Sequence, residues 1–406
     1  MRELKDSGLP WAGMIPNNWN VVRGKNAVKK LKRPTLDDDG VITCFRDGEV
    51  TLRSKRREDG FTFSFQETGY QGIEPGDLVI HGMDGFAGAI GISDSRGKAT
   101  PVLNVLDSEH NKRYLMYYFR TIAKCGYFES VATGIRVRTC DTNWNKISVT
   151  PVILPPLLEQ SRIAAFLDER CAKIDEAVAR HKALIEKLDE YRKAVITQTV
   201  TKGVRGKREM KESGEVWIGA IPSDWSCKKI KYLAKQSTER ANNNTGYLSL
   251  ENVESFTGKF VDTGSTAEGD TLSIHRGQVL FGKLRPYLAK AFFIEHDGCC
   301  SSEFIVLTPD GIEARYFQYG MLSQTFVNRV DVSTYGTKMP RANATFIMNL
   351  LFPVPSPDEQ LEIIAFLDKK CAAIDSAKER HQQLIVKLEE YKKSLIYNAV
   401  TGKIEC

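Results

Sequence analysis

The chain repeats itself: residues 159–201 read EQSRIAAFLDERCAKIDEAVARHKALIEKLDEYRKAVITQTVT, and residues 359–401 read EQLEIIAFLDKKCAAIDSAKERHQQLIVKLEEYKKSLIYNAVT. About 24 of the 43 aligned positions are identical, at a constant offset of 200 and without a gap. Repetition at a fixed spacing indicates that one structural unit is used twice. The sequence therefore predicts two copies of the same long element.

Each copy has the pattern of a long helix. Pro155, Pro156 and Pro355 stand where a helix can begin, and Gly203 and Gly402 stand where it can end. Apolar residues recur in alternating steps of three and four, which is typical of a coiled-coil seam with charged flanks. Some 40 helical residues span about 60 Å. The predicted seam contains Ile174, His181, Leu184, Leu188 and Tyr191 in the first copy and Ile374, His381, Leu384, Leu388 and Tyr391 in the second.

The two helices most simply bury their seams against each other in an antiparallel pair. A domain of ~150 residues has a radius of gyration of ~15 Å, so it cannot easily return the chain about 60 Å to start a parallel helix. Antiparallel pairing gives an internal pseudo-two-fold repeat. Two helices in separate bundles are the alternative. His181 and His381 are expected to form hydrogen bonds that help to set the register, while pH sensing and metal binding are alternatives.

A second repeat precedes each helix. Residues 7–19 read SGLPWAGMIPNNW, and residues 213–225 read SGEVWIGAIPSDW. The roughly 140 residues between the two kinds of repeat are only weakly similar in the two halves. This arrangement suggests one task performed twice, on two different targets. The predicted boundaries are 1–154 and 204–354 for two variable domains, and 155–203 and 355–406 for two helical spacers.

Both variable domains are expected to mix strands and helices. Short apolar runs bounded by turn residues, such as 77–80 and 278–281, are typical of strands. The aromatic-rich runs 113–119 and 315–319 are typical of helices. The predicted fold class is therefore α+β, with two mixed domains joined by two long antiparallel coiled-coil helices.

Composition sets broad limits on the class of protein. The 406 residues carry a formal charge of +6, and 42% of them are hydrophobic, which excludes disordered and fibrous classes and allows two to four domains. The small surplus of positive charge is compatible with nucleic acid but does not demonstrate it. No run of ~18 apolar residues occurs and the first residues lack the apolar core of a signal peptide, so we expect a cytoplasmic protein without membrane contact.

Motifs for catalysis and cofactor binding are missing from the sequence. The nine cysteines include no CxxC pair, and the six histidines form no HExxH pair. No phosphate-binding GxxxxGK[ST] loop is present, and the glycines of 85–91 are more typical of a strand or turn. We expect no catalytic residue, metal or cofactor in this chain. A self-contained DNA methylase or nuclease and a protein-binding coiled-coil scaffold remain alternatives.

Basic residues gather at predicted turns in both halves. Lys and Arg neutralise phosphates, Arg can contact guanine through two hydrogen bonds, and Tyr can pack against sugar or base. A solvated surface is the alternative interpretation. The candidate DNA-binding residues are Arg46, Arg53, Lys55, Arg56, Arg136, Arg138, Lys283, Arg285, Tyr287, Lys338 and Arg341.

The combination resembles the specificity (S) subunit of type I restriction–modification enzymes. The resemblance rests on the WIGAIP run at 217–222 followed by Trp225, and on the PxxxEQ approach to the AFLD run at 165–168. It also rests on the Ile-Asp heptad helix and on the GKLRPYL run at 282–288. These features extend over essentially the whole chain.

The resemblance implies a non-catalytic subunit that gives a larger enzyme its DNA address. Each variable domain would read one half of a bipartite, asymmetric site in double-stranded DNA. The helices would set the gap between the halves and dock two modification subunits, which bind S-adenosylmethionine and methylate adenine N6 on a flipped-out base. Restriction subunits using ATP and Mg would join the same complex. Half-sites one helical turn apart are separated by ~34–36 Å, which a rod of about 60 Å can bridge.

Overall fold

The structure is a computed structural model that describes residues 2–57, 68–132, 142–267, 269–336 and 338–406. The candidate DNA-binding residues Arg136 and Arg138 lie outside the described residues. Contacts divide the chain into two compact units. Unit 1 comprises Met1–Arg180 and Leu384–Cys406, and unit 2 comprises His181–Gln383.

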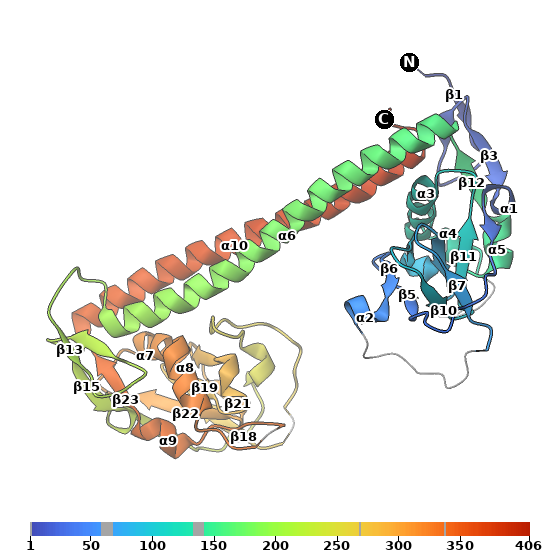
Figure 1. The fold of residues 1–406 in the computed structure, drawn as a ribbon. Coiled ribbons are helices and arrows are strands. Elements are labelled where there is room, and N and C mark those ends of the chain that lie inside the picture. The colour runs from blue at the N-terminus through green and yellow to red at the C-terminus, as the bar shows by residue number, and fades with distance from the viewer. Residues whose placement is uncertain (1, 58–67, 133–141, 268, 337) are drawn as a thin grey trace. The chain divides into compact units, whose positions relative to one another are not determined.

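Two long helices are the main features of the fold, as the repeated sequence predicts. Helix α6 spans Leu157–Lys202 and helix α10 spans Pro357–Val400 (Figure 1, green and orange to red). A glycine with φ +71° follows each helix, directly as Gly203 after α6 and two residues later as Gly402 after α10, a left-handed conformation that favours glycine at a helix terminus. Each helix belongs partly to unit 1 and partly to unit 2, whereas the sequence predicted that the helices form spacers separate from the domains. The four domain boundaries stay a prediction. In the described part of the chain, no helix is both long and apolar enough to cross a membrane.

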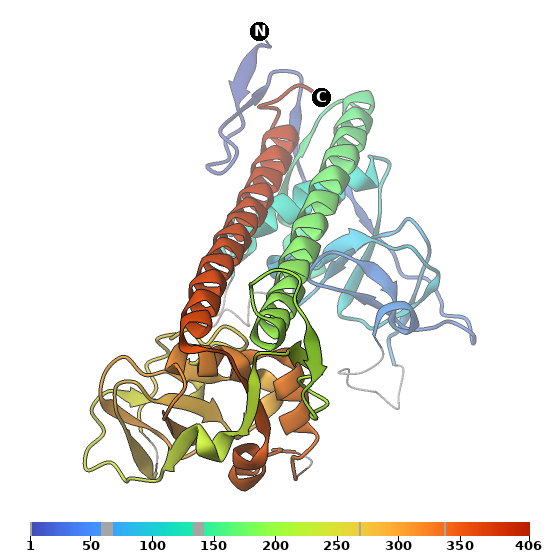
Figure 2. The ribbon, with the colours of Figure 1, turned by 90° about the vertical axis from the view of Figure 1, so that its left-hand side faces the viewer.

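The two helices run antiparallel within unit 2, where they lie side by side (Figure 2). Lys378 Nζ lies 2.5 Å from Asp189 Oδ1, and Arg192 forms an ion pair with Asp375, so the partner number on α10 falls as the number on α6 rises. Only 2% of Arg192 is exposed, so this ion pair is largely buried.

The histidines at matching positions of the two helices contact each other. His181 Nδ1 and His381 Nδ1 are 3.0 Å apart, and the ring centroids are separated by 5.0 Å. One imidazole donates and the other accepts. The two histidines thus form a hydrogen bond with each other across the helix pair. The described residues contain no cluster of three side chains suited to a metal ion.

The predicted seam residues differ in their burial within each heptad. Ile174 and Ile374 are buried, and His181, His381, Leu188 and Leu388 are partly buried. The remaining four are exposed by 38–57%, so the structure contradicts their seam assignment; they are Leu184, Tyr191, Leu384 and Tyr391.

On α6 the residues four positions after Ile174, His181 and Leu188 are buried or partly buried, whereas the sequence predicted seam residues three positions after them. Val178 and Arg192 are buried, and Ile185 is partly buried. Residues three and four apart share a helix face, so periodicity alone does not choose between them. Arg192 looked like a charged flanking residue in the sequence, but its ion pair with Asp375 allows it to be buried.

A four-stranded antiparallel sheet lies at the centre of unit 1, in the order β4-β11-β8-β9. Helix α3, which spans Lys112–Lys124, packs against it, and the side chain of Asn111 accepts hydrogen bonds at the start of α3. The sheet strands are β4 (Lys29–Lys30), β8 (Leu78–His81), β9 (Ile90–Ile92) and β11 (Leu103–Asp107). The remaining elements of unit 1 are β1 (Leu4–Asp6), β2 (Met14–Pro16), β3 (Asn20–Arg23), α1 (Gly24–Ala27), β5 (Ile42–Cys44), β6 (Val50–Leu52), α2 (Arg53–Arg56), β7 (Gln71–Ile73), η1 (Gly85–Ala87), β10 (Gly97–Ala99), α4 (Tyr127–Ser130), α5 (Trp144–Val149) and β12 (Pro151–Leu154).

Unit 2 contains the same arrangement, in the order β16-β22-β19-β20 with helix α7 (Ala314–Leu322) packed against it. The sheet strands are β16 (Ala234–Ser237), β19 (Val279–Gly282), β20 (Ala291–Phe293) and β22 (Phe304–Pro309). The remaining elements are β13 (Met210–Glu212), β14 (Ala220–Pro222), β15 (Ser226–Lys229), η3 (Ile230–Tyr232), β17 (Tyr247–Leu248), η4 (Leu250–Asn252), β18 (Thr271–Ile274), η5 (Pro286–Leu288), β21 (Gly298–Ser301), α8 (Gln324–Asp331), α9 (Ala344–Asn349) and β23 (Leu351–Val354). The predicted mixed α/β character of both halves is confirmed.

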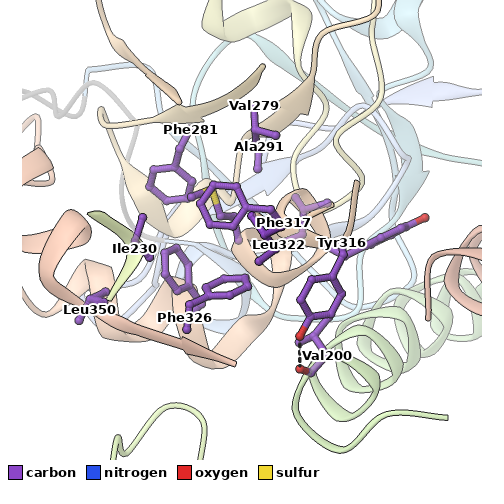
Figure 3. Close-up of a cluster of buried hydrophobic side chains, with 14 of the residues drawn as sticks. Val200, Ile230, Val279, Phe281, Ala291, Tyr316, Phe317, Leu322, Phe326 and Leu350 are labelled. Atoms are coloured by element: carbon purple, nitrogen blue, oxygen red, sulfur yellow. Dashed lines mark hydrogen bonds between the residues drawn. The ribbon is translucent and has the colours of Figure 1, made fainter. Parts of the chain in front are cut away.

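Each core also holds the C-terminal end of one long helix. In unit 2, Phe281, Phe317 and Phe326 are fully buried, and the Tyr316 hydroxyl donates to the carbonyl of Val200 at 3.1 Å (Figure 3). In unit 1, the Tyr114 hydroxyl is 3.4 Å from the carbonyl oxygen of Val400. The end of α6 is thus bonded into unit 2, and the end of α10 into unit 1.

Candidate nucleic-acid interface

Two of the predicted basic segments meet in unit 2. The Arg285 amide donates to the carbonyl of Pro340 at 2.8 Å, and the Ala342 amide donates to the carbonyl of Lys283 at 2.8 Å. Arg285 has φ +50°, an uncommon conformation for a residue other than glycine. The hydrogen bonds hold the turn after β19 beside the segment that precedes α9. Lys283, Arg285, Tyr287, Lys338 and Arg341 are therefore brought into one region.

The side chains of this region differ in how free they are. Arg285 is exposed and has neither an ion pair nor a side-chain hydrogen bond within the described ranges. Tyr287 is 44% exposed, and Lys338 is exposed as well. Arg341, in contrast, binds Glu303 through two nitrogens, with Nη2 to Oε1 at 3.0 Å and Nε to Oε2 at 3.2 Å. Arg285, Tyr287 and Lys338 are thus the exposed side chains of this region.

Three of the candidates of unit 1, namely Arg46, Lys55 and Arg56, are held by acidic neighbours. Arg46 Nη2 lies 2.8 Å from Asp84 Oδ1, and Lys55 Nζ lies 3.2 Å from Asp94 Oδ2. Arg56 forms ion pairs with Asp47 and Glu49, so helix α2 is bonded to the turn that contains Arg46. Arg53 donates from Nε to Thr43 Oγ1, and burial lowers its pKa. Exposed ion pairs are worth about 0–1 kcal/mol, so phosphates can compete for Arg46, Lys55 and Arg56.

The sequence predictions did not include an aspartate that recurs in both units. Asp168 Oδ1 accepts from Arg113 Nη2 at 3.0 Å and from the Tyr117 hydroxyl at 2.8 Å. Asp368 Oδ1 accepts from Arg315 and Tyr319 in the same way, at 2.7 and 2.5 Å. Burial, followed by the hydrogen bond to the aspartate, raises the pKa of both tyrosines. The AFLD run of both helices and the aromatic-rich runs 113–119 and 315–319 were the available signal, and the structure shows that they bond a variable domain to its helix.

The repeated tryptophans and glutamates also meet. Trp19 Nε1 donates to Glu159 Oε2 at 3.0 Å, and Trp225 Nε1 donates to Glu359 Oε2 at 2.9 Å. Glu159 also pairs with Arg2, and Glu359 pairs with Arg208. The two kinds of repeat found in the sequence thus form one structural joint in each unit.

Comparison of the sequence with known proteins finds similarity to type I restriction enzyme specificity subunits. Residues 222–385 match the family model for the type I restriction modification DNA specificity domain. The chain is 25% identical to the type I restriction enzyme EcoDI specificity subunit of Escherichia coli over 276 residues, which is 62% of this chain and 62% of that protein. It is 22% identical to the MjaVIII specificity subunit of Methanocaldococcus jannaschii over 420 aligned residues, covering 96% of this chain and 94% of that one.

Comparison of folds finds two solved structures with a similar architecture. A chain from a study of complex assembly and conformational transition of the type I R-M system has a TM-score of 0.72 at 13% identity, covering 96% of this chain and 99% of that chain. The HsdS subunit from Thermoanaerobacter tengcongensis has a TM-score of 0.54 at 14% identity, covering 96% and 98%. Residues 222–385 thus match the type I restriction modification DNA specificity domain, and over longer stretches the chain is similar in sequence to type I restriction enzyme specificity subunits.

Proposed function

We propose that the two variable domains read the two halves of a bipartite, asymmetric site in double-stranded DNA, and that this chain catalyses no reaction itself. One observation carries the proposal: the same fold and the same joints to the helices occur twice, whereas the turns at equivalent places differ. Met83 and Asp84 follow β8, while Leu284 and Arg285 follow β19. A shared scaffold with different turn chemistry is what two readers of different sequences require.

Exposed side chains of both units can contact DNA, through base edges in unit 2 and through phosphates in unit 1. The free guanidinium of Arg285 can donate two hydrogen bonds to guanine O6 and N7 in the major groove. The basic side chains Arg46, Lys55 and Arg56 of unit 1 can exchange their carboxylate partners for phosphates.

The long helices would set the gap between the half-sites and dock two modification subunits. Leu184 and Tyr191 of unit 2 leave 38% and 49% of their surface exposed, and Leu384 and Tyr391 of unit 1 leave 42% and 57% exposed. Apolar side chains left exposed on a helix favour contact with another protein surface. The modification subunits would supply S-adenosylmethionine and methylate adenine, and restriction subunits would supply the sites for ATP and Mg. A cytoplasmic location belongs to the same proposal because the target is DNA.

The proposed function is tested by mapping methylated adenines in DNA treated with the modification subunit, with and without this chain. We expect methylation at one two-part sequence only when both proteins are present. Methyl transfer by this chain alone would favour a self-contained methylase. Failure of the two proteins to bind duplex DNA in a salt-sensitive manner would favour a protein-binding scaffold.

Substituting Arg285→Ala should weaken binding to the half-site that unit 2 reads. Loss of a two-bond contact to guanine costs about 1–3 kcal/mol, which is roughly five- to 150-fold in affinity. The measurement is a titration of duplex DNA with the complex of this chain and its modification subunit. Arg276→Ala is the matched control, because Arg276 is also an exposed arginine of unit 2 but lies in another turn. Equal affinities of the two variants would remove Arg285 from the set of DNA contacts.

A further inference from the structure

Unit 1 contains a cavity of about 770 Å³ between α3, α6 and α10. Met116, Cys171 and Ile396 contribute apolar surface to it. Five basic and three acidic side chains also line the cavity. Its size lies within the ~300–1,000 Å³ that is usual for small-molecule sites. The cavity can therefore hold a compact ligand that has an apolar part and negative charge.

The basic residues of the cavity are only partly neutralised. Arg113 is 2.6 Å from Asp168, and Lys392 is 2.6 Å from Asp175. Lys124 and Lys393 have no ion pair in the described part of the chain. Lys124 is exposed at the mouth of the cavity, but partial desolvation there, followed by the nearby charges of Arg120, Lys393 and Lys392, lowers its pKa. A bound anion would stabilise these crowded ammonium groups.

The equivalent place in unit 2 is a much smaller cavity of about 290 Å³. The turn Thr257–Lys259 lines it, and Lys259 Nζ lies 2.5 Å from Asp375 Oδ2. Lys193, the repeat counterpart of Lys393, lies 3.8 Å from the ring centroid of Phe256. In unit 2 the chain itself thus fills the space and provides a partner for the lysine.

Unit 1 has a turn that corresponds to Thr257–Lys259, but the residue after its glycine is acidic instead of basic. A Cβ added to Gly48 would lie 2.8 Å from the Ile90 carbonyl oxygen of β9, and one added to Gly258 would lie 2.4 Å from the Ala291 carbonyl oxygen of β20. The residue after the glycine is Glu49 in unit 1, which binds Arg56 instead of a long helix. The cavity of unit 1 consequently stays open, and its lysines are left without this partner.

We propose that the cavity of unit 1 binds a phosphate-bearing small molecule of nucleotide size, with its phosphate between Lys124 and Lys393 and its apolar part against Met116 and Ile396. Lys124 of α3 and Lys393 of α10 both line the cavity, and ammonium groups suit the compact charge of a phosphate. The proposal goes beyond DNA addressing, because the site lies against the helices and contains none of the candidate DNA-binding residues.

The test is calorimetric titration of the full-length chain at low salt with pyrophosphate, ADP and adenosine, without DNA. We expect one molecule of pyrophosphate or ADP to bind per chain, and adenosine to bind at least tenfold more weakly. The double variant Lys124→Met, Lys393→Met should lose at least tenfold in affinity for both phosphate probes. Lys193→Met is the matched control and should bind them like the unmodified chain, because Lys193 is the counterpart of Lys393 in unit 2 and lies over the Phe256 ring there.

A second readout separates binding at Lys124 from a general effect of charge. Because the pKa of Lys124 is lowered in the free protein, an anion beside it raises that pKa and causes proton uptake in alkaline buffer. Titrations in two buffers with different ionisation enthalpies measure this uptake, and Lys124→Met should abolish it. Unchanged melting temperatures would show that the variants are folded. The proposal is overturned if neither phosphate probe saturates, if Lys193→Met loses the same affinity, or if an acidic peptide binds the cavity and the phosphate probes do not.

Discussion

Replacing residues 1–154 by the variable domain of another specificity subunit should change one half of the methylated sequence and leave the other half unchanged. The physical reason is that each unit has its own sheet, core and exposed turns. In the proposed function a modification subunit supplies the chemistry in both cases, so only the recognised DNA sequence should differ. The measurement is methylated-adenine mapping of DNA treated with the hybrid chain and the modification subunit.

The hybrid must preserve the joints between domain and helix. The incoming domain has to supply the equivalents of Trp19 for Glu159, and of Arg113 and Tyr117 for Asp168, because these bonds hold the domain on α6. The reciprocal exchange of residues 204–354 is the control, and it should change the other half. A change in both halves from a single exchange would contradict the model of two independent readers.

Substituting Glu359→Ala should destabilise unit 2 by about 3–5 kcal/mol, the usual cost of removing one partner of a buried ion pair. The residue is 0% exposed, accepts from Trp225 Nε1 at 2.9 Å and pairs with Arg208. Its removal leaves the indole N–H and the guanidinium without this carboxylate. Urea unfolding followed by tryptophan fluorescence measures the loss.

Glu362→Ala is a control on the same helix. Glu362 pairs with Arg205 at 2.8 Å, but 46% of its side chain is exposed, so its removal should cost no more than about 1 kcal/mol. Similar small losses for both variants would show that Glu359 does not hold the joint. A large loss for Glu359 alone would confirm that the repeated tryptophan and glutamate act as one structural element.

The long helices were predictable because their signals are local. The prolines before the helices and the glycines after them indicate where each helix begins and ends. The spacing of the apolar residues in steps of three and four identifies the element as a helix. The seam was less predictable. Ile174 and Leu188 belong to a face that the sequence identifies, but Leu184 and Ile185 are adjacent apolar candidates for the next position. Only the partner helix decides between them, and it buries Arg192 because Asp375 lies opposite.

The candidate interface was predictable as two basic segments but not as one surface. The turn at Arg285 and the segment at Pro340 are separated by more than 50 residues and meet through backbone hydrogen bonds. The same limit explains why the joints were missed. Trp19 and Glu159 were both recognised as repeated, yet a contact across 140 residues depends on the packing of the whole unit.

The sequence by itself determined that one variable domain and one helix occur twice, because repetition is visible without any knowledge of contacts. Local patterns were also sufficient for the two helices and for the mixed character of the domains. Only the tertiary structure decided which repeated residues bond to each other and which remain free. Lys259 forms an ion pair with Asp375 in unit 2, whereas Glu49 forms an ion pair with Arg56 in unit 1. The cavity of unit 2 is therefore the smaller of the two equivalent cavities. The reason is physical: ion pairs and burial depend on three-dimensional neighbours, which a period along the chain does not specify.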